Sequence, residues 1–249
     1  MTQPVFDAHC HIIDPSFALV ANDGYLPPPF TVNDYLAQAT PLGVCGGAVV
    51  SGSFQAFDQT YLLDALKRLG PGYVGVTQLP ASVTDDELQR LDRHGVRAVR
   101  FNLRRGGSEQ LHNLEPFAKR VHELLGWHAE LYVDSRDLHA LETRLLRLPE
   151  VSIDHLGLSR DGLPTLLRLA ERGVRVKACG FGRVDFPVGP ALQTLYAANP
   201  HALMFGTDLP STRAPRAFQA HDLALIQEEL GEEGAQMVLW GNARDFYRL

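Results

Sequence analysis

Two histidines and an aspartate alternate near the start of the chain, in the segment VFDAHCHI (5–12). Side chains two residues apart on a strand point to the same side, so we expect Asp7, His9 and His11 to share one face. Two imidazoles at this spacing can chelate a single divalent ion. The alternative is a set of buried polar residues bonded to each other or to water, which is costly wherever a partner is missing. We therefore expect the two histidines to have a functional role.

Similar groups follow two later β-rich segments. His155 comes directly after Asp154 in VSIDHLG (151–157), and Asp208 ends ALMFGTD (202–208). An aspartate at the carboxyl end of a barrel strand can accept a proton from water or bind a metal. The alternative is that Asp208 caps the segment that follows it, since Pro210 comes two residues later. In a parallel barrel, these side chains and the two histidines of the first strand would converge on one site.

The elements that must position these groups are β-rich runs that alternate with amphipathic stretches. The runs are 5–12, 46–52, 73–79, 97–103, 127–133, 151–157, 174–180 and 202–208. Strands that alternate with helices require right-handed parallel crossovers, and eight such units can close into a (β/α)8 barrel. A glycine-rich dinucleotide motif is missing after the first strand, which disfavours a doubly wound sheet. We predict an α/β TIM barrel, one domain over residues 1–249, with an extra C-terminal helix at 232–249 packed outside it.

A long connection over residues 14–31 follows the first predicted strand. It contains Pro15, Gly24 and three consecutive prolines at 27–29, so it is too irregular for a helix. Loops that follow barrel strands lie at the end that holds active sites. We expect this loop to cover part of the barrel mouth.

Composition excludes some classes of protein. Hydrophobic residues make up 45% of the 249 and charged residues 21%, which is enough apolar surface for a large core. The formal charge of -6 comes without a basic run, which disfavours a nucleic-acid partner. We find no signal peptide and no apolar run near the roughly 20 residues that span a bilayer, so we expect no membrane partner. Three scattered cysteines favour a reducing, cytoplasmic setting; a homo-oligomer stays open.

The motifs resemble those of a known family over nearly the whole chain. They are FDAHCHI, GVRAVRFNL, IDHLG, VKACGFGRV, FGTDLP and the closing GNARDFYRL. The chain resembles the amidohydrolase superfamily, in its amidohydrolase-related branch of TIM-barrel metal-dependent hydrolases. Within that branch it is most similar to the 2-pyrone-4,6-dicarboxylate lactonase and sugar-lactonase group. The resemblance implies a lactonase-like hydrolase that opens a lactone or cyclic ester of a carboxylated small molecule.

The resemblance also implies roles for individual residues. Catalytic roles fall on Asp208, as general base or metal ligand, and on His9, His11 and His155. Substrate-binding roles fall on Arg100, Arg183 and Tyr132. We add Arg104 to the substrate-binding group from the strand pattern, because it shares its parity with Arg100 and Asn102.

Arg100 has two interpretations, because a guanidinium inside a barrel rarely lacks a partner. It could form an ion pair with an acidic neighbour such as Asp7 or Glu130. It could instead clamp a substrate carboxylate through two parallel hydrogen bonds, and this is the interpretation we favour.

At most one divalent metal ion is expected, with zinc as the typical choice for imidazole and carboxylate ligands. The ligands would be His9, His11 and Asp208, with His155 close by. The resemblance implies no binuclear centre, since the superfamily's usual fourth-strand lysine or glutamate is missing. It also includes lactonases that need no metal, so a metal-independent site stays open.

Two other functions remain possible at this stage. The same branch includes metal-dependent, non-oxidative decarboxylases of aromatic or unsaturated acids, and release of carbon dioxide without ring opening would identify one. A non-catalytic anion-binding barrel belongs to a different class, and tight anion binding without turnover would favour it.

Overall fold

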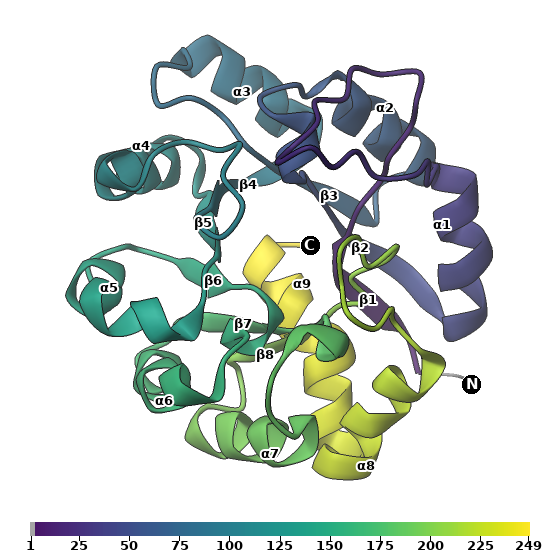
Figure 1. The fold of residues 1–249 in the computed structure, drawn as a ribbon, viewed down its shortest axis with the longest axis vertical. Helices are drawn as coiled ribbons and strands as arrows, with labels where there is room; N and C mark the ends of the chain where they lie inside the picture. Colours follow the sequence, from purple (N-terminus) through teal and green to yellow (C-terminus); the bar gives the residue numbers. More distant parts are fainter. Residues whose placement is uncertain (1–2) are drawn as a thin grey trace.

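Within residues 3–249, which the computed structural model describes, eight parallel strands form a barrel (Figure 1). The strands are β1 (Val5–Cys10), β2 (Val44–Val50), β3 (Tyr73–Thr77), β4 (Val96–Asn102), β5 (His128–Tyr132), β6 (Val151–Ile153), β7 (Arg175–Ala178) and β8 (Leu203–Phe205). Helices α1 (Val32–Ala39), α2 (Thr60–Leu69), α3 (Asp85–Arg93), α4 (Leu114–Leu125), α5 (Leu138–Leu145), α6 (Leu163–Glu171), α7 (Val188–Ala198) and α8 (Ala220–Gln236) follow them in turn. The predicted TIM barrel is confirmed.

The barrel closes between β1 and the residues that follow β8. The backbone N–H of Asp208 donates to the carbonyl of His9 (2.7 Å), and that of His11 donates to the carbonyl of Leu209 (2.8 Å). Gly206 makes this approach possible, because a Cβ there would lie 2.8 Å from the backbone nitrogen of His9. Closure thus brings the first and last strands together where the histidines and Asp208 lie.

Asp7, on the outer side of β1, stabilises this seam, the junction between β1 and the residues that follow β8. Its carboxylate accepts hydrogen bonds from the Thr207 backbone (2.8 Å), the Thr207 hydroxyl (2.7 Å) and the hydroxyl of Tyr35 on α1 (3.0 Å). The expectation that Asp7 shares an inward face with the two histidines is therefore wrong. The pairing of β1 with β2 is irregular between Asp7 and Cys10, so the alternation of side chains breaks before the histidines.

Apolar side chains fill two layers around the strands. Val99 and Leu131 face outward and pack against the helices. Phe6, Val76 and Met204 face inward and fill the lower part of the barrel. This division follows from the alternation of side chains along each strand.

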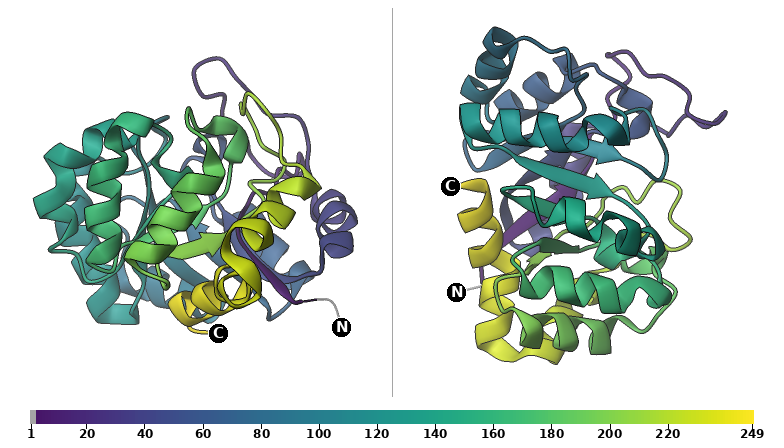
Figure 2. Two further views of the ribbon diagram at one scale, coloured as in Figure 1. Left: turned by 90° about the horizontal axis from the view of Figure 1, so that it is seen from below. Right: turned by 90° about the vertical axis from the view of Figure 1, so that its left-hand side faces the viewer.

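The end of the chain closes the bottom of the barrel. A π-helical turn (Met237–Gly241) joins α8 to α9 (Asn242–Tyr247), and α9 lies across the end from which the strands start (Figures 1 and 2). The ring of Tyr247 stacks 5.7 Å from that of Phe6. The expected extra helix over 232–249 is present, but it continues α8 and plugs the barrel instead of packing on its outside.

The loop over residues 14–31 lies at the opposite end, beyond the carboxyl ends of the strands (Figure 2). A bridge between Ile13 and Phe30 forms its base, and a second bridge between Asn22 and Tyr25 forms its tip. Tyr25 lines the cavity at this end of the barrel, so the predicted position of the loop is confirmed. Among the described residues, we find no helix both long and apolar enough to cross a membrane.

Substitution of Tyr247 tests whether α9 stabilises the barrel by closing its lower end. Tyr247→Ala removes a fully buried ring and is expected to lower the free energy of unfolding by about 3–5 kcal/mol. Tyr247→Phe keeps the ring and should cost far less. Urea denaturation measures both, and wild-type stability of the alanine variant would contradict the structural role of α9.

Candidate active site

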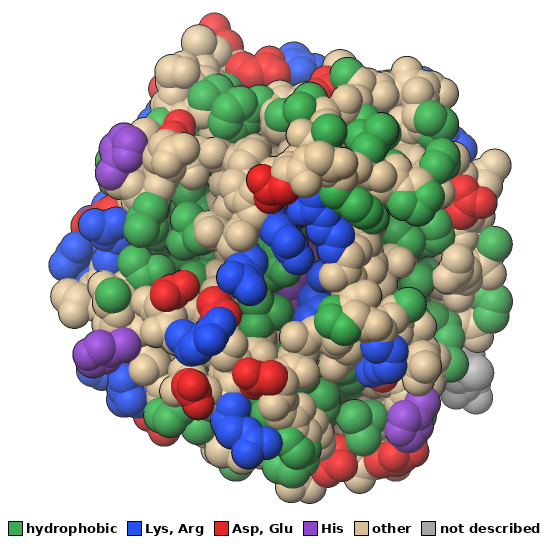
Figure 3. All heavy atoms as spheres, viewed as in Figure 1, with side chains coloured by type: hydrophobic (Ala, Val, Ile, Leu, Met, Phe, Trp, Pro, Cys, Tyr) green, Lys and Arg blue, Asp and Glu red, His purple; other side chains and the backbone are tan. Residues whose placement is uncertain are grey.

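A cavity opens at the carboxyl ends of the strands. Four arginines and two histidines are part of its lining: Arg100, Arg105, Arg183, Arg213, His11 and His155. Figure 3 shows Lys and Arg side chains gathered around a central hollow with histidine inside it. A concave site with this much positive charge attracts anions.

His9 of β1 and His11, which directly follows the strand, meet Asp208 beneath this cavity, and of these three residues His11 lines it. The Nε2 atom of His11 lies 3.7 Å from Oδ1 of Asp208, and Nε2 of His9 lies 4.0 Å from the same oxygen. Within residues 3–249, His9 Nε2 and Asp208 Oδ1 are buried without a hydrogen-bond partner. The sequence-predicted convergence of these three residues is present in the structure.

The donor atoms of this group fit a divalent metal ion. Nδ1 of His11 lies 2.7 Å from the carbonyl oxygen of Val50, which only accepts, so Nδ1 carries the proton and Nε2 has a free lone pair. Nδ1 of His9 faces the Asp154 carboxylate at 3.4 Å. A hydrogen bond from the outer ring nitrogen to a carbonyl, as His11 makes to Val50, orients histidines that bind metals. One atom each of His9, His11 and Asp208 can therefore act as a ligand.

A second group of possible ligands lies beside the first. It consists of His9, Asp154 and His155. Each carboxylate has one oxygen held by an arginine, and Oδ1 of each lacks a hydrogen-bond partner within residues 3–249. Oδ1 of Asp154, however, also lies 4.0 Å from the Lys177 ammonium group, and this second cation would repel a metal ion there. The group that contains Asp208 is therefore the better metal site.

His155 enters the cavity from the turn after β6. Its φ of 52° is in the left-handed region, which is uncommon outside glycine and typical of functional sites. Its Nδ1 lies 3.2 Å from the Cys179 thiol, and a Cβ on Gly180 would lie 2.6 Å from that nitrogen. Burial lowers the pKa of His155 from 6.5 to about 3. The ring is therefore neutral at pH 7, with Nε2 left for a ligand.

Asp208 also has left-handed backbone, with a φ of 59°. Its Oδ2 accepts from Nε of Arg183 at 2.6 Å. Burial by itself raises the pKa of Asp208, but the Arg183 guanidinium outweighs it and holds this pKa below its usual range. Arg183 also donates to the carbonyl of Thr212 at 2.9 Å. Asp208 is thus an ionised carboxylate with one oxygen held and one oxygen unpaired.

Arg100 forms buried contacts with the protein. It donates to Asp154 and to the carbonyl of Ser51, both at 2.7 Å, and its Nε lies 3.7 Å from Glu130. The ion-pair interpretation therefore describes this structure, although Asp154 is the main partner and Asp7 is not one. Arg100 still lines the cavity and lies over the ring of Tyr132, 5.5 Å from its centroid.

The same buried network contains a lysine. Lys177 contacts the Glu130 carboxylate and lies 3.4 Å from Nδ1 of His9. Glu130, Asp154, Arg100 and Lys177 are all buried, so two cations compensate two anions beneath the histidines. Buried pairs of this kind are strongly destabilised when one partner is removed.

Arg104 does not reach the cavity, and its neighbour Arg105 does. β4 ends at Asn102, so the strand alternation that placed Arg104 beside Arg100 stops there. The side chain of Asn102 accepts from the backbone N–H of Arg105 (2.9 Å) and turns the chain. Arg104 is exposed and Arg105 lines the cavity, so the placement of Arg104 in the site is wrong.

The sequence reasoning missed Arg105, Arg213 and Tyr25 as cavity residues. The charge of Arg105 was visible in the sequence, but its direction depends on the turn at Asn102. Arg213 lies in the loop after β8, five residues beyond Asp208, where strand periodicity gives no information. Tyr132, in contrast, is a predicted site residue that does line the cavity.

The buried network leads to a prediction about stability. Lys177→Met leaves the Glu130 carboxylate without its ammonium group and is expected to cost about 3–5 kcal/mol of unfolding free energy. Adding Glu130→Gln should recover much of that loss. Urea denaturation of the two single variants and the double variant measures the coupling energy between Lys177 and Glu130. If the two changes in unfolding free energy simply add, the ion pair does not contribute to stability.

Two curated relatives share sequence with the chain. A 2-pyrone-4,6-dicarboxylate hydrolase of Comamonas testosteroni is 33% identical over 61% of this chain, a match that spans 51% of that enzyme. A 4-sulfomuconolactone hydrolase of Hydrogenophaga intermedia is 26% identical over 82% of this chain and 74% of that enzyme. The chain thus aligns with about half the length of the Comamonas enzyme.

A solved structure shares both fold and sequence. The putative 2-pyrone-4,6-dicarboxylic acid hydrolase of Pseudomonas putida superposes with a TM-score of 0.84 at 27% identity, over 100% of this chain and 98% of that one. The family model of the amidohydrolases matches residues 6–249, which include every histidine, arginine and aspartate of the site. The chain therefore belongs to the amidohydrolase family.

Proposed function

We propose that this protein is a hydrolase that opens a lactone or cyclic ester of a carboxylated small molecule. The observation that carries the proposal is the unpaired Oδ1 of Asp208, which lies beside the Nε2 atoms of His9 and His11 below a cavity rich in arginine. The two curated relatives are named as hydrolases, one of them of a lactone, which supports the same activity here.

Asp208 would act as the general base. Its carboxylate is ionised and one oxygen is unpaired, so it can accept a proton from the water that attacks the ester carbonyl. Arg183 holds the other oxygen and fixes the direction of the free one. Because Arg183 also weakens Asp208 as a base, positive charge near the water must assist proton removal.

His155 would stabilise the oxyanion that forms on the carbonyl. The ring is neutral and its Nδ1 faces Cys179, so Nε2 faces the side on which a ligand enters. An N–H group at Nε2 would donate a hydrogen bond to the carbonyl oxygen as negative charge develops there. The ring of Tyr132 packs nearly perpendicular to this imidazole, with 5.0 Å between the ring centroids, and limits its movement.

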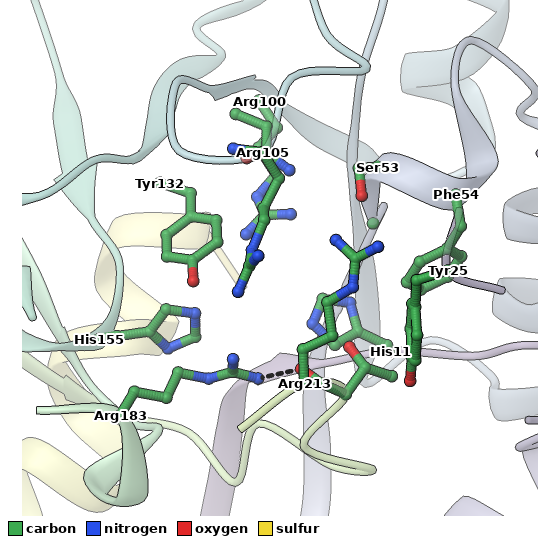
Figure 4. A pocket seen from close by; sticks show the side chains of 13 residues that line it. His11, Tyr25, Ser53, Phe54, Arg100, Arg105, Tyr132, His155, Arg183 and Arg213 are labelled. Atoms are coloured by element: carbon green, nitrogen blue, oxygen red, sulfur yellow. Dashed lines mark hydrogen bonds between the residues drawn. The ribbon is translucent and has the colours of Figure 1, made fainter. Parts of the chain in front are cut away.

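Arginines would orient the substrate carboxylates. Arg105 and Arg183 line the cavity near His155 (Figure 4), and a guanidinium can bind a carboxylate through two parallel hydrogen bonds. Arg100 would contribute its charge from the cavity wall, since its guanidinium is already held by the Asp154 carboxylate and the Ser51 carbonyl. Held in this way, the ester carbonyl would lie between Asp208 and His155.

We also propose one zinc ion, held by His9, His11 and Asp208, as the metal of this site. The unpaired donor atoms and the proton on Nδ1 of His11 support it. Zinc would supply positive charge beside the attacking water and the carbonyl oxygen. A site in which the histidines act without a metal remains the alternative. The cytoplasmic location and a homo-oligomer stay predictions from the sequence.

Asp208→Asn tests the base. The amide cannot accept the proton, so we expect kcat for 2-pyrone-4,6-dicarboxylate or another carboxylated lactone to fall about 10²- to 10⁴-fold. Asp222→Asn is a matched control, because Asp222 pairs with Arg216 outside the cavity. Circular dichroism checks the fold, and full activity of Asp208→Asn would remove Asp208 as the base.

Elemental analysis tests the metal ligands. Purified protein is expected to hold about one zinc per chain at a site of this ligand type, and His9→Ala with His11→Ala should remove it. If zinc stays at full occupancy in the double variant, the ligand assignment is wrong. If the wild-type protein never holds metal but the double variant is inactive, the histidines act on the carbonyl directly.

A further inference from the structure

We propose that Arg213 is a specificity-determining residue of this site, which binds the anionic group of the substrate farthest from the ester bond. The inference rests on the proposed function of the cavity. It adds a residue from the loop after β8, outside the motifs that identified the site. Four observations carry it: the distribution of charge, the contacts that hold Arg213, the links between three loops, and the rigid connection to Asp208.

The arginines of the cavity differ in how their charge is compensated. Arg100 and Arg183 form ion pairs with Asp154 and Asp208. Within the described part of the chain, neither Arg105 nor Arg213 forms an ion pair with a carboxylate. The two side chains approach the cavity from opposite sides (Figure 4). Like charges that face one cavity repel each other, and an anion bound between them would relieve that repulsion.

Arg213 is held in place by neutral groups. It donates to the side-chain oxygen of Asn22 at 2.9 Å and to the Asn22 carbonyl. Its guanidinium lies over the ring of Tyr25, 4.3 Å from the centroid. A guanidinium has five N–H groups, so N–H groups remain for a ligand after these bonds form. The charge of Arg213 is therefore positioned but not neutralised.

Asn22 links this arginine to the opposite wall. Its side-chain N–H donates to the backbone carbonyl of Arg105 at 3.0 Å. Asn22 itself is fixed by a tight turn, because it exchanges two backbone hydrogen bonds of 3.0 Å with Tyr25. One asparagine thus joins the loops after β1, β4 and β8, and ties the Arg213 guanidinium to the backbone of Arg105.

The loop that carries Arg213 is also fixed to the base. Thr212, the preceding residue, accepts from Arg183, and Arg183 holds Asp208. Ser211 and Arg213 both have left-handed backbone, with φ of 64° and 57°. A backbone held in this region is defined by its surroundings. The separation between Asp208 and Arg213 is therefore fixed, and it can select a substrate by the distance between its ester and its anionic group.

Binding of two inert aromatic acids tests the proposal without any turnover. Benzoate has one carboxylate, and isophthalate has two at a fixed distance. Calorimetry on the full chain should show that Arg213→Met weakens isophthalate binding about 10- to 100-fold, the loss expected for one charge-assisted hydrogen bond or a pair of them. Benzoate binding should change by less than about threefold, because its single carboxylate can use the other arginines.

Three further variants sharpen the test. Arg104→Met is the matched control, because it removes an exposed arginine beside the site and should leave both affinities unchanged. Arg213→Lys keeps the charge and should retain part of the isophthalate affinity. Asn22→Ala loosens Arg213 without altering the lining, and should weaken isophthalate selectively. If Arg213→Met does not fold, the isophthalate and benzoate affinities of Arg213→Lys and Asn22→Ala test the proposal instead.

Three results would overturn the proposal. One is equal weakening of benzoate and isophthalate, which indicates that Arg213 only holds the loops together. The second is unchanged isophthalate affinity in Arg213→Met. The third is a wild-type protein that binds isophthalate no more tightly than benzoate. Failure of the proposed function is seen separately, as wild-type protein that binds both acids but turns over no lactone.

Discussion

The site depends on the seam at which the last strand of the barrel returns to the first. Asp7 fastens that seam with a buried carboxylate that accepts from both the backbone and the hydroxyl of Thr207. A buried carboxylate needs several donors to remain in place, and here they come from β1, α1 and the residues after β8. Because the seam closes at this level, Asp208 lies beside His9 and His11, which are about two hundred residues away in the chain.

The positive charges below the histidines are compensated by carboxylates, and those above them are compensated only in part. Below them, Arg100 and Lys177 are compensated by Asp154 and Glu130 in a buried network. Above them, the arginines of the mouth bring positive charge that the protein does not fully compensate. Interactions between charges are strong in such a water-poor interior. The buried network below therefore holds the histidines in place. The uncompensated positive charge of the arginines at the cavity mouth can bind an anionic ligand.

Much of the fold could be predicted from the sequence, because strands and helices follow from local periodicity. The convergence of His155 and Asp208 on the paired histidines followed from parallel strands that end at one edge. The orientation of Asp7 could not be predicted, since the irregular pairing in β1 depends on contacts with β2 and β8. Arg105 lines the cavity in place of the predicted Arg104 because of the turn after β4, and Arg213 lies in the loop after β8. Tertiary contacts determine the conformation of both loops.

The central claim is that water, directed by Asp208, attacks the ester carbonyl of a carboxylated lactone and opens its ring. Turnover of such a lactone in water labelled with heavy oxygen, followed by mass spectrometry, tests this claim most directly. The account predicts one labelled oxygen in the new carboxylate of the ring-opened product and no loss of carbon. Release of carbon dioxide from an intact ring, without the label, would contradict it.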